Sequence, residues 1–206
     1  MIGKLTEFGQ DFVDAARLAY QRKYRALLED GSPQAMQELC LQMGRDGFCG
    51  MTLPRAYGGM ELPLLTVRRV TQAFQVCDLR LGGLAHAGNT GPMCAVVALA
   101  REPLRQRYAQ ALCRGELIMA IGISEPEAGS AATGMKTRAQ IEGDHVVING
   151  SKIFVSNVTE GGCTLLYCRF GTSGTPKDIG AGVGPHDAPG FAKSKGTRDM
   201  AGDMQD

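Results

Sequence analysis

A short polar stretch after an apolar run is the part of this sequence best suited to bind a ligand. Ser124–Ser130 reads S-E-P-E-A-G-S and directly follows the apolar run Leu117–Ile123. Pro126 disfavours a helical conformation of the residue before it, and Gly129 permits a turn that a side chain would hinder. The N–H groups of such a loop need acceptors, and serine hydroxyls flank them. A planar ring rich in acceptors, a diphosphate, or water in an ordinary turn would each meet that need.

A second candidate stretch, Asn149–Asn157, reads N-G-S-K-I-F-V-S-N. Its first two residues form the strongest short signal for a β-hairpin turn, which predicts strands at Val146–Ile148 and Lys152–Ser156. Taken alone, Phe154 fits a core aromatic residue as well as a cofactor contact, and Ser156 is an ordinary strand residue. Position alone therefore leaves both interpretations open.

The composition is that of a folded globular protein with little net charge. Hydrophobic residues make up 44% of the 206 residues, which argues against disorder. Lys and Arg number 22 against 21 Asp and Glu, so electrostatics favours neither nucleic acid nor an anionic membrane as a partner. The densest basic group, Arg22, Lys23 and Arg25, is better explained as a solvated helix face. The longest apolar runs, such as Met93–Ala100, are too short to span a bilayer.

The spacing of the cysteines and histidines does not indicate a metal site. Seven cysteines occur without a C-x-x-C pair, and the three histidines do not combine with them at zinc spacing. An odd number of scattered cysteines, without a signal or transit peptide, is typical of a reducing compartment. We therefore expect a cytoplasmic protein without a bound metal.

Helical periodicity dominates the first 115 residues. Apolar residues recur there at three- and four-residue steps. This pattern predicts five helices, near residues 6–29, 33–44, 63–74, 86–100 and 103–115. Asp30-Gly31 ends the first helix, and Ser32-Pro33 supplies a cap and a first-turn proline for the second.

The periodicity changes after Gly115. An apolar run at 117–124 suits a buried strand, and Lys136–Glu142 alternates as a half-buried strand does. Glu142-Gly143-Asp144 turns the chain, and we expect further strands at 146–148, 152–156 and 163–170.

Beyond Gly171 the pattern is lost in Gly and Pro residues. Gly180, Gly182 and Gly184 alternate without a following helix, so we interpret them as flexible chain and not as a Rossmann G-x-G-x-x-G motif.

The order of the elements predicts an α+β protein and not an alternating βαβ fold. We expect a helical domain at residues 1–115 and a β domain at residues 116–206.

Several motifs together resemble the acyl-CoA dehydrogenase family. Gly122–Ser130 fits the family's first fingerprint at every position. That pattern is a small residue, an aliphatic residue, Ser or Thr, Glu, two free positions, a small residue, Gly, and then Ser or Thr. Ala131 departs from the family, which has Asp at the next position. Asn149–Asn157 matches the run N-G-x-K-x-W/F-I-T-N. Weaker matches occur at Leu53–Gly59, Arg107–Glu116 and Ala188–Phe191, so the resemblance extends over nearly the whole chain.

This resemblance implies a fold, a cofactor and a binding site. The fold is an N-terminal helical bundle followed by an antiparallel β-barrel or sandwich domain, incomplete here, and the cofactor is FAD. The implied flavin contacts are Ile121, Gly122, Ile123, Ser124, Gly129, Ser130, Phe154, Val155 and Ser156. Ser130 would also approach the acyl-CoA substrate.

The resemblance also implies a reaction: α,β-dehydrogenation of an acyl-CoA thioester, with hydride transfer to the flavin. The catalytic base of the family is a Glu in a C-terminal helical domain, which is missing here, so we expect no catalytic residue in this chain and interpret Glu125 as a carboxylate that orders the loop. Implied partners are an electron acceptor such as an electron-transfer flavoprotein and further copies of the chain, in a dimer or tetramer. A flavin monooxygenase, an acyl-CoA oxidase and a truncated non-catalytic binding protein remain alternatives.

Overall fold

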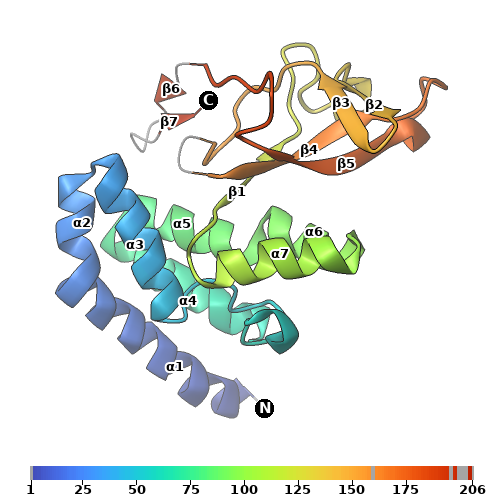
Figure 1. Ribbon diagram of the computed structural model, residues 1–206. Coiled ribbons are helices and arrows are strands. Elements are labelled where there is room, and N and C mark those ends of the chain that lie inside the picture. The colour runs from blue at the N-terminus through green and yellow to red at the C-terminus, as the bar shows by residue number, and fades with distance from the viewer. Residues whose placement is uncertain (1, 159–160, 195–196, 199–203, 206) are drawn as a thin grey trace. The chain divides into compact units, whose positions relative to one another are not determined.

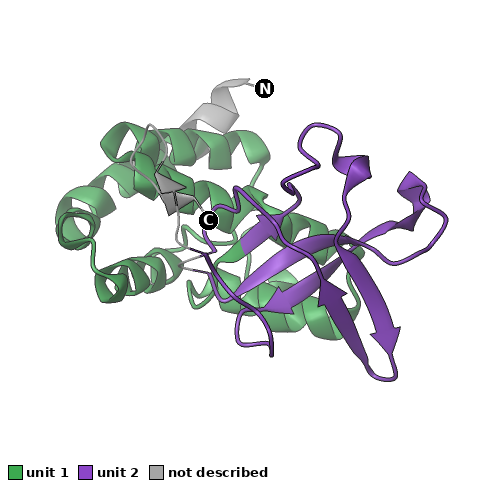
Figure 2. Cartoon of the chain, turned by 90° about the horizontal axis from the view of Figure 1, so that it is seen from above, with its two compact units in different colours: residues 1–119 green, residues 120–206 purple. Residues whose placement is uncertain are grey.

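Helices occupy the first part of the chain and strands the second (Figure 1). The computed structural model describes residues 2–158, 161–194, 197–198 and 204–205. The chain divides into two compact units, residues 1–119 and 120–206 (Figure 2).

The helical unit follows the apolar periodicity of the sequence. Gly31 (φ 62°) ends α2 in the left-handed conformation, and the Ser32 hydroxyl caps α3 by accepting a hydrogen bond from Ala35 N at 3.2 Å. The elements are α1 (Ile2–Ala19), a π-helical turn (Tyr20–Tyr24), α2 (Arg25–Asp30), α3 (Pro33–Arg45), α4 (Leu64–Cys77), α5 (Leu79–Thr90), α6 (Pro92–Leu99) and α7 (Glu102–Cys113).

One predicted helix is wrong: residues 86–100 belong to two helices, α5 and α6. Asp78 caps α5 by accepting a hydrogen bond from Arg80 N at 2.9 Å, so this helix begins earlier than its apolar pattern indicates. Gly91 (φ −90°, ψ −143°) leaves the helical region, and Pro92 then begins α6, because proline lacks the N–H that would continue α5.

Three aromatic rings lie at the centre of the helical unit. Phe48 and Phe74 meet edge to face with ring centroids 5.0 Å apart, and Tyr24 lies 6.1 Å from Phe74. Asn89, which is buried, accepts a hydrogen bond from Met51 N at 2.6 Å and donates to Phe48 O at 2.7 Å. The amide of Asn89 thereby ties the loop after α3 to α5.

The second unit contains a five-stranded mixed sheet. Its strands are β1 (Met119–Gly122), β2 (Arg138–Glu142), β3 (His145–Asn149), β4 (Cys163–Arg169) and β5 (Ile179–Pro185). Their order is β1-β4-β2-β3, with β5 also paired to β4. The strand pairs β2–β3 and β4–β5 are antiparallel, but β2 meets β4 in parallel where Arg138 pairs with Arg169. The α+β fold is confirmed, while the expectation of a purely antiparallel sheet is wrong. A short pair, β6 (Thr197–Arg198) and β7 (Met204–Gln205), forms a separate sheet.

The glycine-rich segment near residue 180 is strand β5, so its interpretation as flexible chain is wrong. Gly180 pairs with Cys168, Gly182 with Leu166 and Gly184 with Thr164. A Cβ at Gly184 would lie 2.8 Å from Leu166 Cδ1, and one at Gly180 would lie 2.9 Å from a carbon of Phe170. Gly180 and Gly184 therefore make room for side chains of the neighbouring strand and its end.

The predicted strand at residues 152–156 is also wrong. Phe154 (φ 55°) and Asn157 (φ 64°) adopt left-handed conformations that interrupt a strand. Asn149-Gly150 therefore has no strand directly after it and does not form a hairpin turn. The hairpin of β2 and β3 turns earlier, at Gly143-Asp144, as the Glu142-Gly143-Asp144 signal predicts. Gly150 (φ 154°) instead allows a close approach, because a Cβ there would lie 2.4 Å from Thr137 Oγ1.

Candidate functional site

The two polar stretches singled out in the sequence lie side by side in the second unit. Ile153 N donates a hydrogen bond to Ser124 O at 2.9 Å. Lys152 Nζ donates to Ile123 O at 3.0 Å. The end of β1 and the loop after β3 are therefore in direct contact.

The first stretch turns sharply directly after the strand. Glu125 N donates to Ala128 O at 3.0 Å, and Ala128 N donates back to Glu125 O at 3.1 Å. Within the residues that the structure describes, the hydroxyls of Ser124 and Ser130 have no hydrogen-bond partner, and Gly129 and Ser130 are exposed. The turn thus satisfies two of its own backbone N–H groups, and its two serine hydroxyls are left to bond a ligand or water.

The end of β1 fits closely against its neighbours. Gly122 is buried, and a Cβ there would lie 3.0 Å from Leu166 Cδ2 and 3.3 Å from Lys152 Cγ. Ile121 remains 37% exposed and Ile123 is half-buried. The backbone at Gly122 is thus fixed by packing, while the neighbouring isoleucines reach the surface.

Phe154 has the most unusual conformation in the second stretch. Its side chain is 70% exposed and its φ is 55°. A residue other than glycine in this region costs about 1–3 kcal/mol and persists only where its surroundings hold it. Val155, by contrast, is buried against Ala120, Val158 and Phe191, and Ser156 is exposed. An aromatic ring held out toward solvent at such a cost is suited to cover a ligand.

Glu125 is unsuited to act as a base. Its side chain is buried and lies 2.8 Å from Lys152 Nζ in an ion pair. Burial opposes its ionisation, but hydrogen bonds from Lys152, Thr137 and Lys136 outweigh this effect and lower the pKa of Glu125 to about 2. The carboxylate therefore stays ionised and bonded, which agrees with a role in ordering the loop.

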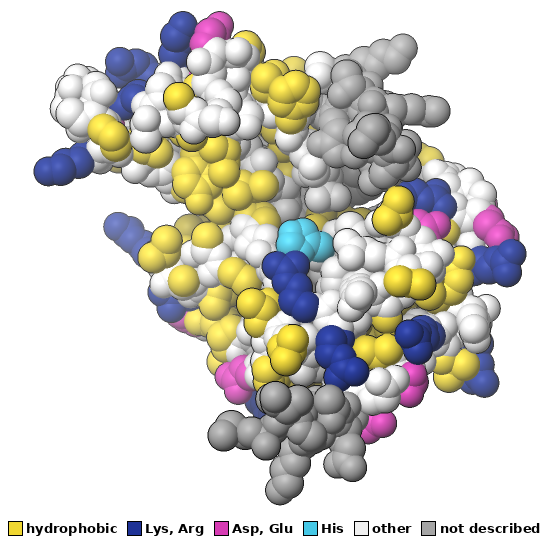
Figure 3. All heavy atoms as spheres, turned by 180° about the vertical axis from the view of Figure 1, so that it is seen from behind, with side chains coloured by type: hydrophobic (Ala, Val, Ile, Leu, Met, Phe, Trp, Pro, Cys, Tyr) yellow, Lys and Arg dark blue, Asp and Glu magenta, His cyan; other side chains and the backbone are white. Residues whose placement is uncertain are grey.

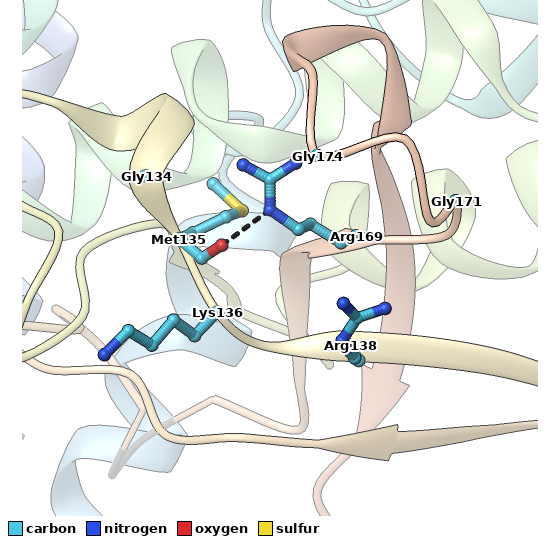
Figure 4. A pocket seen from close by; sticks show the side chains of 7 residues that line it. All are labelled: Gly134, Met135, Lys136, Arg138, Arg169, Gly171 and Gly174. Atoms are coloured by element: carbon cyan, nitrogen blue, oxygen red, sulfur yellow. Dashed lines mark hydrogen bonds between the residues drawn. The ribbon is translucent and has the colours of Figure 1, made fainter.

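The same unit contains a basic pocket that sequence reasoning did not find. The pocket has a volume of about 420 Å³ (Figure 4) and is lined by Gly134, Met135, Lys136, Arg138, Arg169, Gly171 and Gly174. Arg169 Nε donates to Met135 O at 2.8 Å and Nη1 donates to Thr175 O at 3.0 Å, so this guanidinium orders the walls.

Two cations of the basic pocket remain available to an anion. In the described part of the chain, the side chains of Lys136 and Arg138 form no hydrogen bond or ion pair, and both are exposed. Only the pairing of β2 with β4 brings Arg138 next to Arg169, and the local sequence carries no signal of that pairing.

Other classes of site find no support in the described residues. No group of three or more His, Cys, Asp or Glu side chains there is arranged to hold a metal ion. Among those residues, no helix has the length and apolarity needed to cross a membrane. The face drawn in Figure 3 carries basic, acidic and apolar side chains.

Comparison with known proteins covers both units. The family model for the acyl-CoA dehydrogenase N-terminal domain matches residues 6–116, and the model for the acyl-CoA dehydrogenase middle domain matches residues 120–204. Mitochondrial isovaleryl-CoA dehydrogenase of Pongo abelii is 30% identical over 168 residues, which cover 78% of this chain and 38% of that protein. The 3-sulfinopropanoyl-CoA desulfinase of Variovorax paradoxus is 34% identical over 134 residues, 65% of this chain and 33% of that protein.

The fold also matches solved structures. Glutaryl-CoA dehydrogenase of Mycobacterium smegmatis, in complex with FADH2, superimposes with a TM-score of 0.82 at 20% identity, over 96% of this chain and 50% of that one. The chain spans less than two fifths of the length of the two curated relatives. Its two matched domains nevertheless account for nearly all of its residues. The chain therefore belongs to the acyl-CoA dehydrogenase family, whose members are flavoprotein oxidoreductases of acyl-CoA metabolism.

Proposed function

We propose that this chain forms the FAD-binding part of an acyl-CoA dehydrogenase that introduces an α,β double bond into an acyl-CoA thioester. In this proposal, residues 1–115 are the helical domain and residues 116–206 are the flavin-binding β domain. The observation that carries the proposal is the hydrogen bond of 2.9 Å between Ile153 N and Ser124 O. It brings the free Ser124 hydroxyl next to the segment that carries the exposed Phe154 ring.

The residues present fit a flavin. An isoalloxazine ring system needs donors along its polar edge and an apolar surface for its face. The backbone of Ile121–Ser124, with Gly129 and Ser130, would supply the donors, and the exposed ring of Phe154, whose backbone has a positive φ, would supply the surface. The next residue, Val155, would hold this segment in place, because the Val155 side chain is buried in an apolar cluster.

A flavin held at this site would supply the hydride acceptor, and the chain's own residues would position the reactants. The hydroxyl of Ser124 would bond the ring edge, and that of Ser156 would lie near the reactive nitrogen. Ser130, at the exposed end of the turn, would approach the acyl-CoA. Glu125 would take no part in proton transfer, because its carboxylate is buried and stays ionised.

The basic pocket suits the phosphate groups of coenzyme A. Its exposed cations, Lys136 and Arg138, lie on the same unit as Ser130, and phosphate oxygens favour such partners. We therefore propose this pocket as a phosphate-binding part of the substrate site.

The proposal includes partners of the whole protein. The relatives named above act on CoA thioesters by their names, and we propose an acyl-CoA as the substrate here as well. An electron-transfer flavoprotein would reoxidise the flavin, and the complete protein would form a homo-oligomer. A different flavin reaction is the competing candidate, because a relative at 34% identity is a desulfinase.

Flavin titration followed by anaerobic reduction tests the proposal. We expect the purified chain to bind added FAD with quenching of flavin fluorescence. In the complete polypeptide, an acyl-CoA added without oxygen should bleach the flavin absorbance. Failure to bind FAD would contradict the proposed site. Bleaching followed by rapid reoxidation in air with release of peroxide would assign an oxidase, and binding without bleaching would assign a non-catalytic protein.

A further inference from the structure

A buried ion pair lies directly behind the proposed flavin site. Lys152 Nζ and Glu125 Oε1 are 2.8 Å apart, with side chains only 6% and 3% exposed. Removing two charges from water costs several kcal/mol per ion, and well-packed apolar residues are often as stabilising as a buried pair. The stability of the fold alone therefore gives no sufficient reason for this pair.

The pair joins three segments that are distant in sequence. Lys152, in the loop after β3, donates to the carbonyl of Ile123 at the end of β1, at 3.0 Å. Glu125 accepts hydrogen bonds from Lys136 N at 2.5 Å and Thr137 N at 3.0 Å, where the chain enters β2. Both charges thus bond to the backbone as well as to each other.

Each member of the pair is a close chain neighbour of a proposed flavin contact. Glu125 directly follows Ser124, and Lys152 lies two residues before Phe154. Ile153, between Lys152 and Phe154, makes the hydrogen bond to Ser124 O. Neither charged side chain reaches the surface, so neither would touch the ligand itself.

We propose that Lys152 and Glu125 are positioning residues, whose ion pair fixes Ser124 and Phe154 in their ligand-binding arrangement before any flavin arrives. This inference rests on the proposed function. A site that is already ordered does not lose conformational entropy on binding, so the benefit of the pair lies in flavin affinity.

The hydrogen bonds to the backbone determine which position must carry the negative charge and which the positive charge. Glu125 accepts from N–H groups and Lys152 donates to a carbonyl, so exchanging the two residues would place each charge against backbone groups of the wrong polarity. An ion pair that acted only through mutual attraction would tolerate this exchange. The exchanged variant Glu125→Lys/Lys152→Glu is therefore expected not to restore the site.

The first test needs no ligand. In the unaltered chain, the amide proton of Ile153 should be protected from exchange because it bonds to Ser124 O. We expect Lys152→Met to reduce this protection at least tenfold, while circular dichroism shows a folded protein. Unchanged protection in this variant would overturn the proposal, whatever the flavin result.

The second test measures FAD affinity and the visible spectrum of the bound flavin. We expect Lys152→Met and Glu125→Gln to raise the Kd for FAD at least tenfold and to alter the visible band. Glu116→Gln, which breaks an exposed ion pair with Arg114 in the other unit, is the matched control and should change neither. An unaltered chain without FAD affinity would refute the proposed function, whereas variants that match it in affinity and spectrum would refute the positioning role alone.

A conservative variant covers the case in which Lys152→Met does not fold. Lys152→Arg keeps the positive charge beside Glu125, but the larger planar guanidinium does not reproduce the bond to Ile123 O. We expect it to fold and to show intermediate Ile153 protection and FAD affinity. Both values at the level of the unaltered chain would overturn the inference.

Discussion

The ring of His186 stacks on the ring of Phe191, with centroids 4.6 Å apart and planes inclined by only 9°. Phe191 in turn packs against Ala120, Val155 and Val158. The imidazole is bonded at both nitrogens, to Gly161 O and to Thr164 Oγ1, each at 2.7 Å. His186 thus supports the small apolar cluster beneath the segment that carries Phe154.

Acid should weaken the β unit through this histidine. Burial is the main cause that lowers the pKa of His186, and the nearby charge of Lys193 lowers it further. The bond to Gly161 O and the charge of Asp187 raise the pKa but do not cancel this decrease. The unfolded chain therefore binds the proton at a higher pH than the folded chain. The contribution of His186 to the free energy of unfolding is fully present above about pH 6.5, the pKa of an unperturbed histidine. This contribution is lost as the pH falls below that value. Urea unfolding between pH 5 and 8 measures the slope.

A pair of variants isolates this contribution. His186→Phe retains a ring for stacking and should remove the part of the slope near pH 6. Gln140→Ala, at an exposed residue of β2 that does not titrate, should leave the slope unchanged. Identical slopes in all three proteins would contradict the prediction.

Phe154→Gly should separate stability from ligand binding. Glycine adopts a positive φ without steric cost, so the free energy of unfolding of the ligand-free chain should stay the same or rise by up to about 1 kcal/mol. FAD affinity should fall, because the exposed ring is lost. Thermal unfolding and fluorescence titration measure the two effects. Phe170→Gly is the control, since Phe170 lacks a positive φ and should lose stability. A Phe154→Gly variant that binds FAD normally would show that the ring is not a flavin contact.

Strand β5 allows a matched pair of glycine substitutions. No atom lies within 4 Å of a Cβ placed at Gly182, whereas one at Gly184 meets Leu166 Cδ1 at 2.8 Å. Gly182→Ala should therefore be neutral or stabilise by about 0.5–1 kcal/mol, through lower entropy of the unfolded chain. Gly184→Ala should destabilise the same unit. Chemical denaturation checks both, and equal effects would argue against the observed packing of β5 on β4.

Removing the free cations of the basic pocket should weaken acyl-CoA binding selectively. We expect Lys136→Ala/Arg138→Ala to raise the Kd for an acyl-CoA about tenfold, equivalent to about 1.4 kcal/mol, and to reduce its dependence on salt. FAD affinity should not change. Arg101→Ala/Arg107→Ala removes the same charge from the helical unit and should have no effect. Isothermal titration at two salt concentrations distinguishes these outcomes, and an equal loss in both double variants would indicate only a general effect of net charge.

The sequence allows prediction of those features that are determined locally. Ser32 caps α3 and Gly31 ends α2 because their own conformations decide the helix ends. The two motifs were found because each is a short continuous run, and the structure places those runs beside each other. Their role as flavin contacts stays a prediction.

The features that were missed depend on distant partners. Gly180 and Gly184 of β5 pack against Phe170 and Leu166, and the local sequence does not reveal these contacts. The Asn149-Gly150 signal does not produce a hairpin, since no strand directly follows it, and Gly150 instead lies close to Thr137. The basic pocket likewise arises only when Arg138 meets Arg169 across two strands.

The position of strand β4 within the sheet affects the order in which backbone amides of the β unit exchange with solvent. It pairs with β1, β2 and β5, so its backbone groups are shared among three neighbours. Fraying of one neighbour releases only those β4 amides that bond to it, so all of the β4 amides become accessible to solvent together only when the whole unit comes apart. Deuterium should therefore enter Cys163–Arg169 last within this unit, at a rate that reports the global unfolding of the sheet.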